Sequence, residues 1–159
     1  MDNRKPYEFA DEELLKGALK KDRYFQEMLY RKYADGMFTV ACNYCDNDDE
    51  AADVLQESFI KVFKYVKQHD HSKSLGGWIR RIVINTALEQ YKKKKRHLEV
   101  VEEFAAYTEE APDLFENIHE IELVKYVNQL PSKAAMVLKL YTLEGYAHQE
   151  IATTMGISV

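Results

Sequence analysis

One stretch of the sequence carries side chains of the types that contact nucleic acids. Trp78, Arg81, Asn85 and Lys92 follow one another at intervals of three, four and seven residues, a spacing that places them along one face of a helix. An aromatic ring stacks on bases, a guanidinium pairs with phosphates, and an amide reads base edges. The pattern therefore predicts a nucleic-acid surface, with a position in the protein core as the alternative for Trp78.

The distribution of charge supports this prediction, although the whole chain is acidic. The sequence has 159 residues, with 27 Asp and Glu against 22 Lys and Arg, and a net charge of -5. Residues 46–57 hold six acids and no base, residues 71–96 hold eight bases and one acid, and residues 99–122 hold nine acids and no base. Because phosphate contacts need positive charge locally rather than overall, the basic block indicates a nucleic-acid face. A solvated helix end is the alternative for the lysine run at residues 92–96.

A second candidate for chemistry is the pair Cys42-x-x-Cys45, which has the spacing of half a zinc site or of a redox dithiol. His69 and His71 would complete the zinc ligands. Both cysteines lie at the end of an apolar stripe, where a reduced cysteine behaves as a small buried hydrophobe. The sequence also has no Gly-rich phosphate loop and no hydrolase or metalloprotease motif. We therefore expect a protein without catalytic activity, metal or cofactor.

These residues must be positioned by helices. Apolar residues recur at helical spacing almost throughout, and no segment alternates with a period of two. With 46% apolar residues, six glycines and three prolines, the composition is typical of a globular chain and excludes collagen-like and disordered classes. We expect an all-α protein whose first three helices carry apolar stripes within residues 14–19, 25–44 and 51–66.

Capping and loop signals set the boundaries around the basic block. Asn47-x-x-Glu50 has the spacing of a capping box and predicts the start of the third helix. The segment at residues 67–77 lacks periodicity and ends in a glycine pair, so we expect a loop there. The fourth helix is then expected at about residues 78–96, with Ile79, Ile82, Val83 and Thr86 on the face opposite the nucleic-acid surface.

The second half of the chain reads as a separate small domain. We expect domains at residues 1–96 and 113–159, joined by an acidic linker at residues 97–112 that ends in Pro-Asp. Asp113-x-x-Glu116 repeats the capping pattern before an apolar stripe at residues 114–127. Pro131 is suited to begin the next helix. That helix is expected to end at Gly145 and to turn inward Ala134, Val137, Leu138 and Tyr141.

The last elements suggest a helix-turn-helix. A short helix is expected from about His148 to Met155, stopped by Gly156, and Ser158 stands where the N-cap of a further helix belongs. In a helix-turn-helix the second helix enters the major groove of DNA. Because this helix would lie beyond Val159, we expect the module to be truncated within its DNA-reading part.

Nothing in the sequence indicates a membrane protein. The longest stretch free of Asp, Glu, Lys and Arg covers residues 36–45, whereas a spanning helix needs about 20 apolar residues. The N-terminus has no apolar core of the kind found in secretory signals. We therefore expect a cytoplasmic protein without membrane insertion.

Four short motifs, in order, resemble those of a known family, the extracytoplasmic-function group of the sigma-70 family. These proteins are promoter-recognition subunits of bacterial RNA polymerase. The first motif, Asp53-Val54-Leu55-Gln56-Glu57-Ser58-Phe59, is similar to the family's D-x-x-Q-E-x-F. The second, from Gly77 to Ile82 with Asn85, is similar to W-[LI]-x-R-I-x-x-N. The remaining resemblance lies in Leu130-Pro131, Leu143-Glu144-Gly145, Glu150-Ile151-Ala152 and Gly156-Ile157-Ser158.

The resemblance implies partners for each segment. Asp53, Gln56 and Glu57 would bind the clamp helices of the largest subunit of core RNA polymerase. The alternative is a solvated helix face with pairs such as Glu57 to Lys61. The loop at residues 69–77 would capture an unpaired base of the minus-10 element of promoter DNA, and the second domain would bind the minus-35 element. An anti-sigma factor is a further possible partner. The DNA-binding residues implied are His71, Ser72, Lys73, Trp78, Arg80, Arg81, Asn85, Lys92, Lys93, Lys94, Lys95 and Arg96.

Two other functions remain open at this point. An ordinary helix-turn-helix regulator would read DNA with its C-terminal module and would leave Asp53, Gln56 and Glu57 without a partner. A helical zinc or thiol-redox protein would use Cys42 and Cys45.

Overall fold

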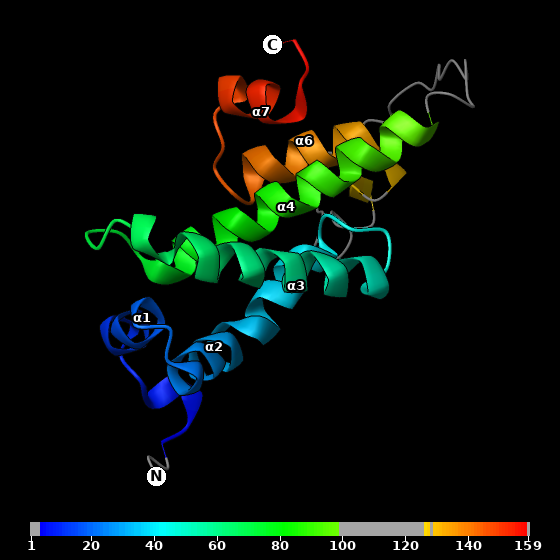
Figure 1. Ribbon diagram of the computed structural model, residues 1–159. Helices are drawn as coiled ribbons and strands as arrows, with labels where there is room; N and C mark the ends of the chain where they lie inside the picture. Colours follow the sequence, from blue (N-terminus) through cyan, green and yellow to red (C-terminus); the bar gives the residue numbers. More distant parts are fainter. Residues whose placement is uncertain (1–3, 99–125, 128, 159) are drawn as a thin grey trace, which may run out of the picture. The chain divides into compact units, whose positions relative to one another are not determined.

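The computed structural model describes residues 4–98, 126–127 and 129–158, except for the side chains of residues 96–98. Every regular element within these ranges is a helix, and no strand occurs among them (Figure 1). This confirms the prediction of an all-α protein. The chain divides into two compact units, Met1–Lys94 and Lys95–Val159. None of the described helices is both long enough and apolar enough to cross a membrane.

The described part of the first unit consists of α-helices and two short 3-10 helices. In chain order these are η1 (Pro6–Glu8), α1 (Asp11–Leu19), α2 (Arg23–Cys42), α3 (Asp48–Tyr65), η2 (Val66–Gln68) and α4 (Leu75–Leu98). Helix α1 packs on α2, α2 packs on α3, and η2 contacts both α1 and α3. Most residues of the three predicted apolar stripes are buried, and the core also takes in Phe9 and residues of α4. Its fully buried side chains include Phe9, Leu14, Leu29, Val54, Val62, Ile79, Val83 and Leu88.

The close packing of α1 on α2 depends on a glycine. Gly17 is buried in α1, and a Cβ atom there would overlap the Cβ and Cγ atoms of Phe25 in α2. The Phe25 ring is itself held edge-on to Phe9 and Tyr24, with ring centroids 6.2 and 5.5 Å apart. Because interiors are close-packed, any side chain at Gly17 would force these helices apart.

The start of α3 is confirmed, with one difference in its capping. The Asn47 side chain accepts a hydrogen bond from the backbone N–H of Glu50 at 2.9 Å, as a capping box requires. The Glu50 carboxylate, however, accepts from the N–H of Asp46 at 3.1 Å. In a capping box the Glu50 side chain would accept from the N–H of Asn47, so the observed hydrogen bond goes to the preceding residue instead.

The prediction of a loop up to residue 77 was wrong, because α4 begins at Leu75. Ser74 caps this helix: its Oγ accepts from the N–H of Gly77 at 3.2 Å, and its carbonyl accepts from the N–H of Trp78 at 3.1 Å. Gly76 permits close packing of α4 and does not serve an unusual loop conformation. A Cβ atom at Gly76 would lie 3.0 Å from the Tyr33 ring of α2.

The second unit contains α6 (Ser132–Thr142) and α7 (His148–Met155), which contact each other. The predicted extent of α7 is confirmed, and Gly156 ends it in a left-handed conformation with φ of +65°. Helix α6 stops earlier than expected, at Thr142. Gly145, with φ of +68°, lies in the turn that follows. The expected linker and the expected helix at residues 114–127 fall outside the described residues, except at their ends.

The inward face of α6 differs from the prediction by about one residue. Leu138 and Tyr141, expected inside, are 37% and 51% exposed, and Ala134, also expected inside, is exposed as well. The Tyr141 ring stacks on His148 instead, with centroids 4.6 Å apart and planes 7° apart. The turn sets the orientation of α6, since the N–H of Tyr146 donates to the Leu140 carbonyl at 3.0 Å. The side chains of α6 that are buried are Ala135, Met136 and Leu140.

Candidate nucleic-acid interface

The loop before α4 has a defined shape. The Asp70 carboxylate accepts from the backbone N–H of Ser72 at 3.0 Å and from the Ser72 hydroxyl at 2.7 Å. The N–H of Lys73 donates to the Asp70 carbonyl at 2.9 Å. The hydrogen bond from the Ser72 hydroxyl is the main cause that lowers the pKa of Asp70. This turn leaves His71, Ser72 and Lys73 exposed.

A buried histidine lies at the base of this loop. His69 is 6% exposed, and neither Nδ1 nor Nε2 has a hydrogen-bond partner among the described residues. Its ring stands edge-on to Trp78 and His71, with centroids 5.2 and 5.7 Å apart. A buried polar group without a partner costs free energy unless something else occupies the site. Sequence reasoning placed His69 in the loop but gave no sign of its burial.

A cavity of about 260 Å³ lies between this loop and α1. From the loop side, its lining includes His69, His71 and Lys73, and α1 contributes Asp11 and Leu15. The lining thus combines two imidazole rings with two lysines, two carboxylates and apolar atoms. These are the types of group that stack on and hydrogen-bond to a planar polar molecule.

Asp11 is fixed in this wall by residues of α2. Its carboxylate accepts from Lys32 Nζ and Tyr33 Oη, each at 2.7 Å. Burial acts to raise the pKa of Asp11, but the hydrogen bonds from Lys32 and Tyr33 outweigh it and the pKa is lowered. The carboxylate is therefore held ionised at the mouth of the cavity.

The outer face of α4 carries the predicted nucleic-acid residues. Arg81 is exposed, and Trp78, Arg80, Asn85 and Lys92 are partly exposed. Three of the four residues expected on the opposite face, Ile79, Val83 and Thr86, are fully buried, and Ile82 is partly exposed. Trp78 is thus neither a core residue nor a free surface ring, since one side of it rests on His69.

The lysine run at the end of α4 is not uniform. Lys94 Nζ lies 2.6 Å from both Asp46 Oδ2 and Glu50 Oε1, at the start of α3. The hydrogen bond to Asp46, followed by that to Glu50, raises the pKa of Lys94. Lys93 is exposed and Lys92 and Lys95 are partly exposed, whereas the side chain of Arg96 lies outside the described part of the chain.

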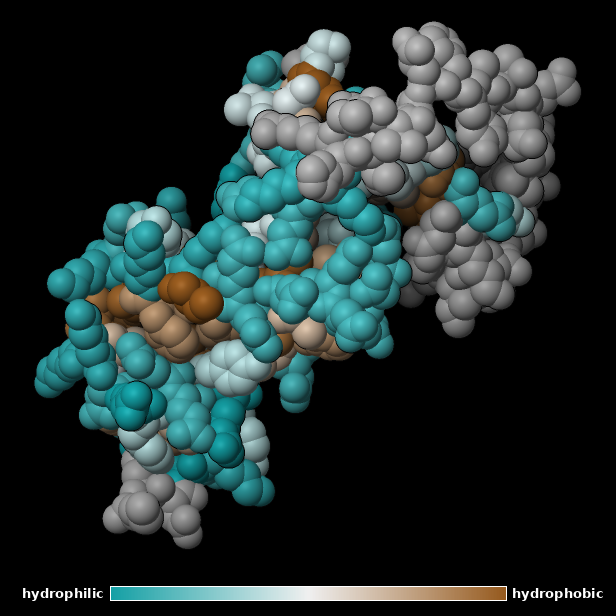
Figure 2. Space-filling model, turned by 45° about the vertical axis from the view of Figure 1, so that its right-hand side comes forward, coloured by the Kyte–Doolittle hydropathy of each residue, from teal (hydrophilic) through white to brown (hydrophobic). Residues whose placement is uncertain are grey.

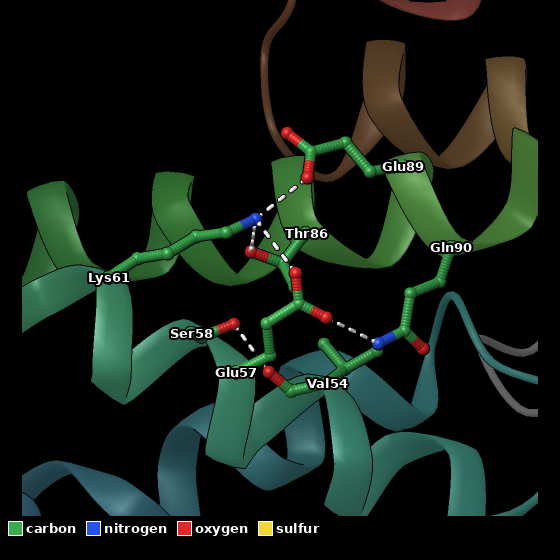
Figure 3. A network of polar contacts seen from close by, with 7 residues as sticks. All are labelled: Val54, Glu57, Ser58, Lys61, Thr86, Glu89 and Gln90. Carbon is green, nitrogen blue, oxygen red and sulfur yellow. Dashed lines mark hydrogen bonds and ion pairs between the residues drawn. The ribbon is translucent and has the colours of Figure 1, made fainter. Parts of the chain in front are cut away.

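The three residues expected to bind polymerase differ in their surroundings. Asp53 and Gln56 are exposed on α3. Glu57 is turned toward α4, where its Oε2 accepts from Gln90 Nε2 at 2.8 Å and its Oε1 lies 3.2 Å from Lys61 Nζ (Figure 3). The hydrogen bond from Gln90 is the main cause that lowers the pKa of Glu57.

Lys61 extends this network into α4. Its Nζ lies 2.7 Å from Glu89 Oε2 and 3.2 Å from Thr86 Oγ1, as Figure 3 shows. The i,i+4 spacing indicated the contact between Lys61 and Glu57, which is present. The contacts with α4 were missed, because they join residues 25 to 33 positions apart and no local pattern signals them.

A groove between α2 and α3 is a further feature that sequence reasoning missed. It has a volume of about 390 Å³ and is lined by Tyr30, Ala34, Phe38 and Leu55, with Arg31 and Asp35 at its polar positions. Figure 2 shows apolar surface crossing the mostly hydrophilic face of the first unit. Helix α3 also exposes Ile60, at 68%.

Cys42 and Cys45 are both free thiols. Within the ranges that the structure describes, no group of three or more His, Cys, Asp and Glu side chains is arranged to hold a metal ion. His69 and His71 therefore do not join the cysteines in such a site. Burial, with a smaller contribution from Glu50, raises the pKa of Cys45 to about 11.

Comparison with known proteins defines the class of this chain. The family model described as Sigma-70 region 2 matches residues 29–97, and that described as Sigma-70, region 4 matches residues 120–159. The first match covers most of α2, all of α3 and nearly all of α4, and the second covers α6 and α7. The chain therefore belongs to the sigma-70 family of RNA polymerase sigma factors, in its extracytoplasmic-function group. The region 2 match distinguishes it from an ordinary helix-turn-helix regulator.

Individual relatives agree with this assignment. The chain is 27% identical over 137 residues to the ECF RNA polymerase sigma factor SigE of Mycolicibacterium smegmatis, a match that covers 82% of this chain and 53% of that protein. It is 27% identical over 162 residues to the RNA polymerase sigma-H factor of Pseudomonas aeruginosa, covering 94% and 84%. The chain thus spans about half the length of the first relative and most of the second.

Solved structures share the fold. The sigma factor RpoE, crystallised with the anti-sigma factor NepR from Bartonella quintana, superposes with a TM-score of 0.51 at 18% identity, covering 85% of this chain and 84% of that one. CnrH, in complex with the cytosolic domain of CnrY, superposes with a TM-score of 0.51 at 16% identity, covering 91% and 82%.

Proposed function

We propose that this sigma factor binds core RNA polymerase through α3 and opens the minus-10 promoter element with α4 and the loop before it. The observation that carries the proposal is the buried, unpartnered imidazole of His69, which lines a cavity and stands edge-on to Trp78, at the start of a cationic helix face. A site of this kind suits the capture of one unstacked base.

Promoter opening must offset the cost of unpairing and unstacking, which is a few kcal/mol per base. Stacking of a base on an aromatic side chain contributes about 1–3 kcal/mol, and Trp78 is placed for it. Arg81 and the exposed Lys93 supply positive charge along the same helix. Because phosphate contacts of this kind position DNA without reading its sequence, we assign the lysine run to the DNA backbone.

The polymerase contact is assigned to the outer side of α3. Asp53 and Gln56 are exposed there, and the same helix contributes Leu55 to the apolar groove that it forms with α2. A helix that carries an exposed carboxylate and also borders an apolar groove suits a partner with basic and apolar side chains, as expected of the polymerase clamp helices. Glu57 belongs to the same motif but lies at the α4 side.

The second unit is assigned to the minus-35 element, and an anti-sigma factor is proposed as a regulatory partner. Both assignments rest on similarity. Region 4 is matched by residues 120–159, and one of the two solved neighbours is a complex of a sigma factor with an anti-sigma factor. Catalysis belongs to the polymerase in this proposal, and the chain acts as an initiation factor.

Reconstitution with core RNA polymerase tests the proposal. We expect the chain to bind core enzyme and to start transcripts from a subset of a randomised promoter library. The paired substitutions Asp53→Asn and Gln56→Ala should weaken core binding, because they remove the exposed polar contacts of α3. Substitutions at the matched exposed position Lys64, on the same helix, serve as the control. Absence of both core binding and initiation with the folded wild-type chain would show that the proposal is wrong.

A further inference from the structure

The interface between α3 and α4 contains a row of polar contacts. On α3, Glu50, Glu57 and Lys61 share one face at intervals of seven and four residues. On α4 their partners are Lys94, Gln90 and Glu89, with donor–acceptor distances of 2.6, 2.8 and 2.7 Å. The partner numbers fall as the α3 numbers rise, so the helices are antiparallel and the contacts run along their shared length.

The row runs beside buried side chains of both helices. Thr86, which accepts a hydrogen bond from Lys61, is fully buried, as are Val54 and Val83 on the two helices. Apolar surfaces alone tolerate small slips and rotations, since burial is not directional. Hydrogen-bonded polar groups at an interface have one good geometry and are costly when it is lost. The row therefore specifies how α4 is rotated and aligned against α3.

Glu57 is the centre of this arrangement. Both of its carboxylate oxygens are occupied, one by Gln90 and one by Lys61, whereas its neighbours Asp53 and Gln56 are exposed. The three residues share one side of α3, but only Glu57 reaches side chains of α4, while its own side chain stays 38% exposed. Two of the acceptor sites of this carboxylate are thus engaged within the protein, which ties Glu57 to the position of α4.

We infer that Glu57 is a positioning residue for promoter opening: through Gln90 and Lys61 it fixes the rotation of α4, and with it the outward face of Trp78 and Arg81. The inference rests on the proposed function, because it assumes that α4 engages the minus-10 element while α3 holds the polymerase. It predicts that disturbing the contact impairs opening without weakening the attachment to core enzyme.

The test exchanges the two partners of one hydrogen bond. Gln90→Glu places a second carboxylate against Glu57, so the two helices repel each other at this point. In the double variant Glu57→Gln with Gln90→Glu, a donor and an acceptor face each other again with their roles reversed. The size of each side chain is preserved throughout. Gln90→Met, which has a similar shape and no charge, removes the hydrogen bond and provides a second variant should Gln90→Glu fail to fold.

Two quantities are measured with the full chain: its affinity for core polymerase, and the rate of open-complex formation at saturating core enzyme. We expect Gln90→Glu to lower the rate about tenfold, Gln90→Met to lower it severalfold, and the exchanged pair to restore most of it, in line with coupling energies of contacting residues. Core affinity should stay within about twofold of wild type in all of them. Thermal unfolding confirms that each variant is folded.

The outcomes separate the inference from the proposed function. If wild type opens promoters but the exchanged pair stays as slow as Gln90→Glu, the inference is wrong. A loss of core affinity in the exchanged pair but not in the variants at Gln90 alone, with opening unaffected at saturation, assigns Glu57 to the polymerase contact and also overturns the inference. If folded wild-type chain opens no promoter at all, the proposed function fails and the inference falls with it.

Discussion

His69 is the residue whose surroundings are least explained by folding alone. Its ring is buried, yet neither nitrogen has a partner within the described residues. Core histidines usually satisfy at least one ring nitrogen. Burying this imidazole without a partner costs free energy. In the proposed function, a captured base supplies the missing hydrogen-bond partner, which accounts for the histidine at this position.

This reasoning predicts opposite effects of one substitution on stability and function. His69→Leu removes a buried polar group that makes no hydrogen bond within the described residues. The free energy of unfolding should therefore stay the same or rise by about 1 kcal/mol. Promoter opening should fall, because the base loses its polar contact. Urea unfolding and open-complex assays on the same preparation measure both. A loss of stability above about 2 kcal/mol would show that His69 has a structural partner instead.

The cysteines give a second prediction at this scale. With the pKa of Cys45 raised to about 11 by burial and the nearby carboxylate of Glu50, almost no thiolate is present at neutral pH, and the thiolate is the reactive form. Alkylation by iodoacetamide should therefore be slow at pH 8 and should accelerate as the pH approaches 11. The pH dependence of the modification rate, followed by mass spectrometry, measures this. Rapid modification at pH 7, or a disulfide formed under mild oxidants, would favour the thiol-redox alternative.

At the scale of the elements, the spacing of α1 and α2 depends on Gly17. Gly17→Ala should lower the free energy of unfolding by about 1–3 kcal/mol, as overpacked cores do, because the added Cβ overlaps Phe25. Gly36→Ala is the matched control. Gly36 lies in α2 with nothing within 4 Å of an added Cβ, so the substitution should stabilise the helix by about 0.5–1 kcal/mol. Equal effects of the two would contradict the packing seen here.

Most elements were predictable from the sequence because their signals are local. Apolar periodicity located the first helices, and Asn47 and Gly156 marked helix ends by their side-chain or backbone chemistry. The glycine pair before Trp78 was misread as a loop, because the same residues also permit close helix packing. The face of α6 was misplaced by one residue, since the turn after it determines which side meets α7.

The candidate site was only partly predictable. Spacing alone grouped Trp78, Arg81 and Asn85, because helical geometry fixes which residues share a face. The burial of His69 and the bond between Glu57 and Gln90 depend on contacts between helices, which no single segment encodes. Both are the features on which the two proposals rest.

At the scale of the whole molecule, the net charge of -5 describes no single surface. Two of the six acids in residues 46–57, Asp46 and Glu50, are paired with Lys94, so the acidic block is not wholly available to a partner. The same contact engages Lys94, so one positive charge of the basic block is also not available to a partner. What remains exposed is acidic on α3 and basic on α4, which suits a protein that holds polymerase with one helix and DNA with the next.

The measurement that tests this account most directly compares core affinity and promoter opening in wild type, Trp78→Ala and Arg81→Ala. Opening is followed by permanganate reactivity of unpaired thymines in the minus-10 element, with core affinity measured on the same samples. We predict that both variants bind core polymerase like wild type but form about tenfold fewer open complexes, since each loses a stacking or phosphate contact of about 1–3 kcal/mol. Undiminished opening, or loss of core binding in both variants with the fold intact, would contradict the account.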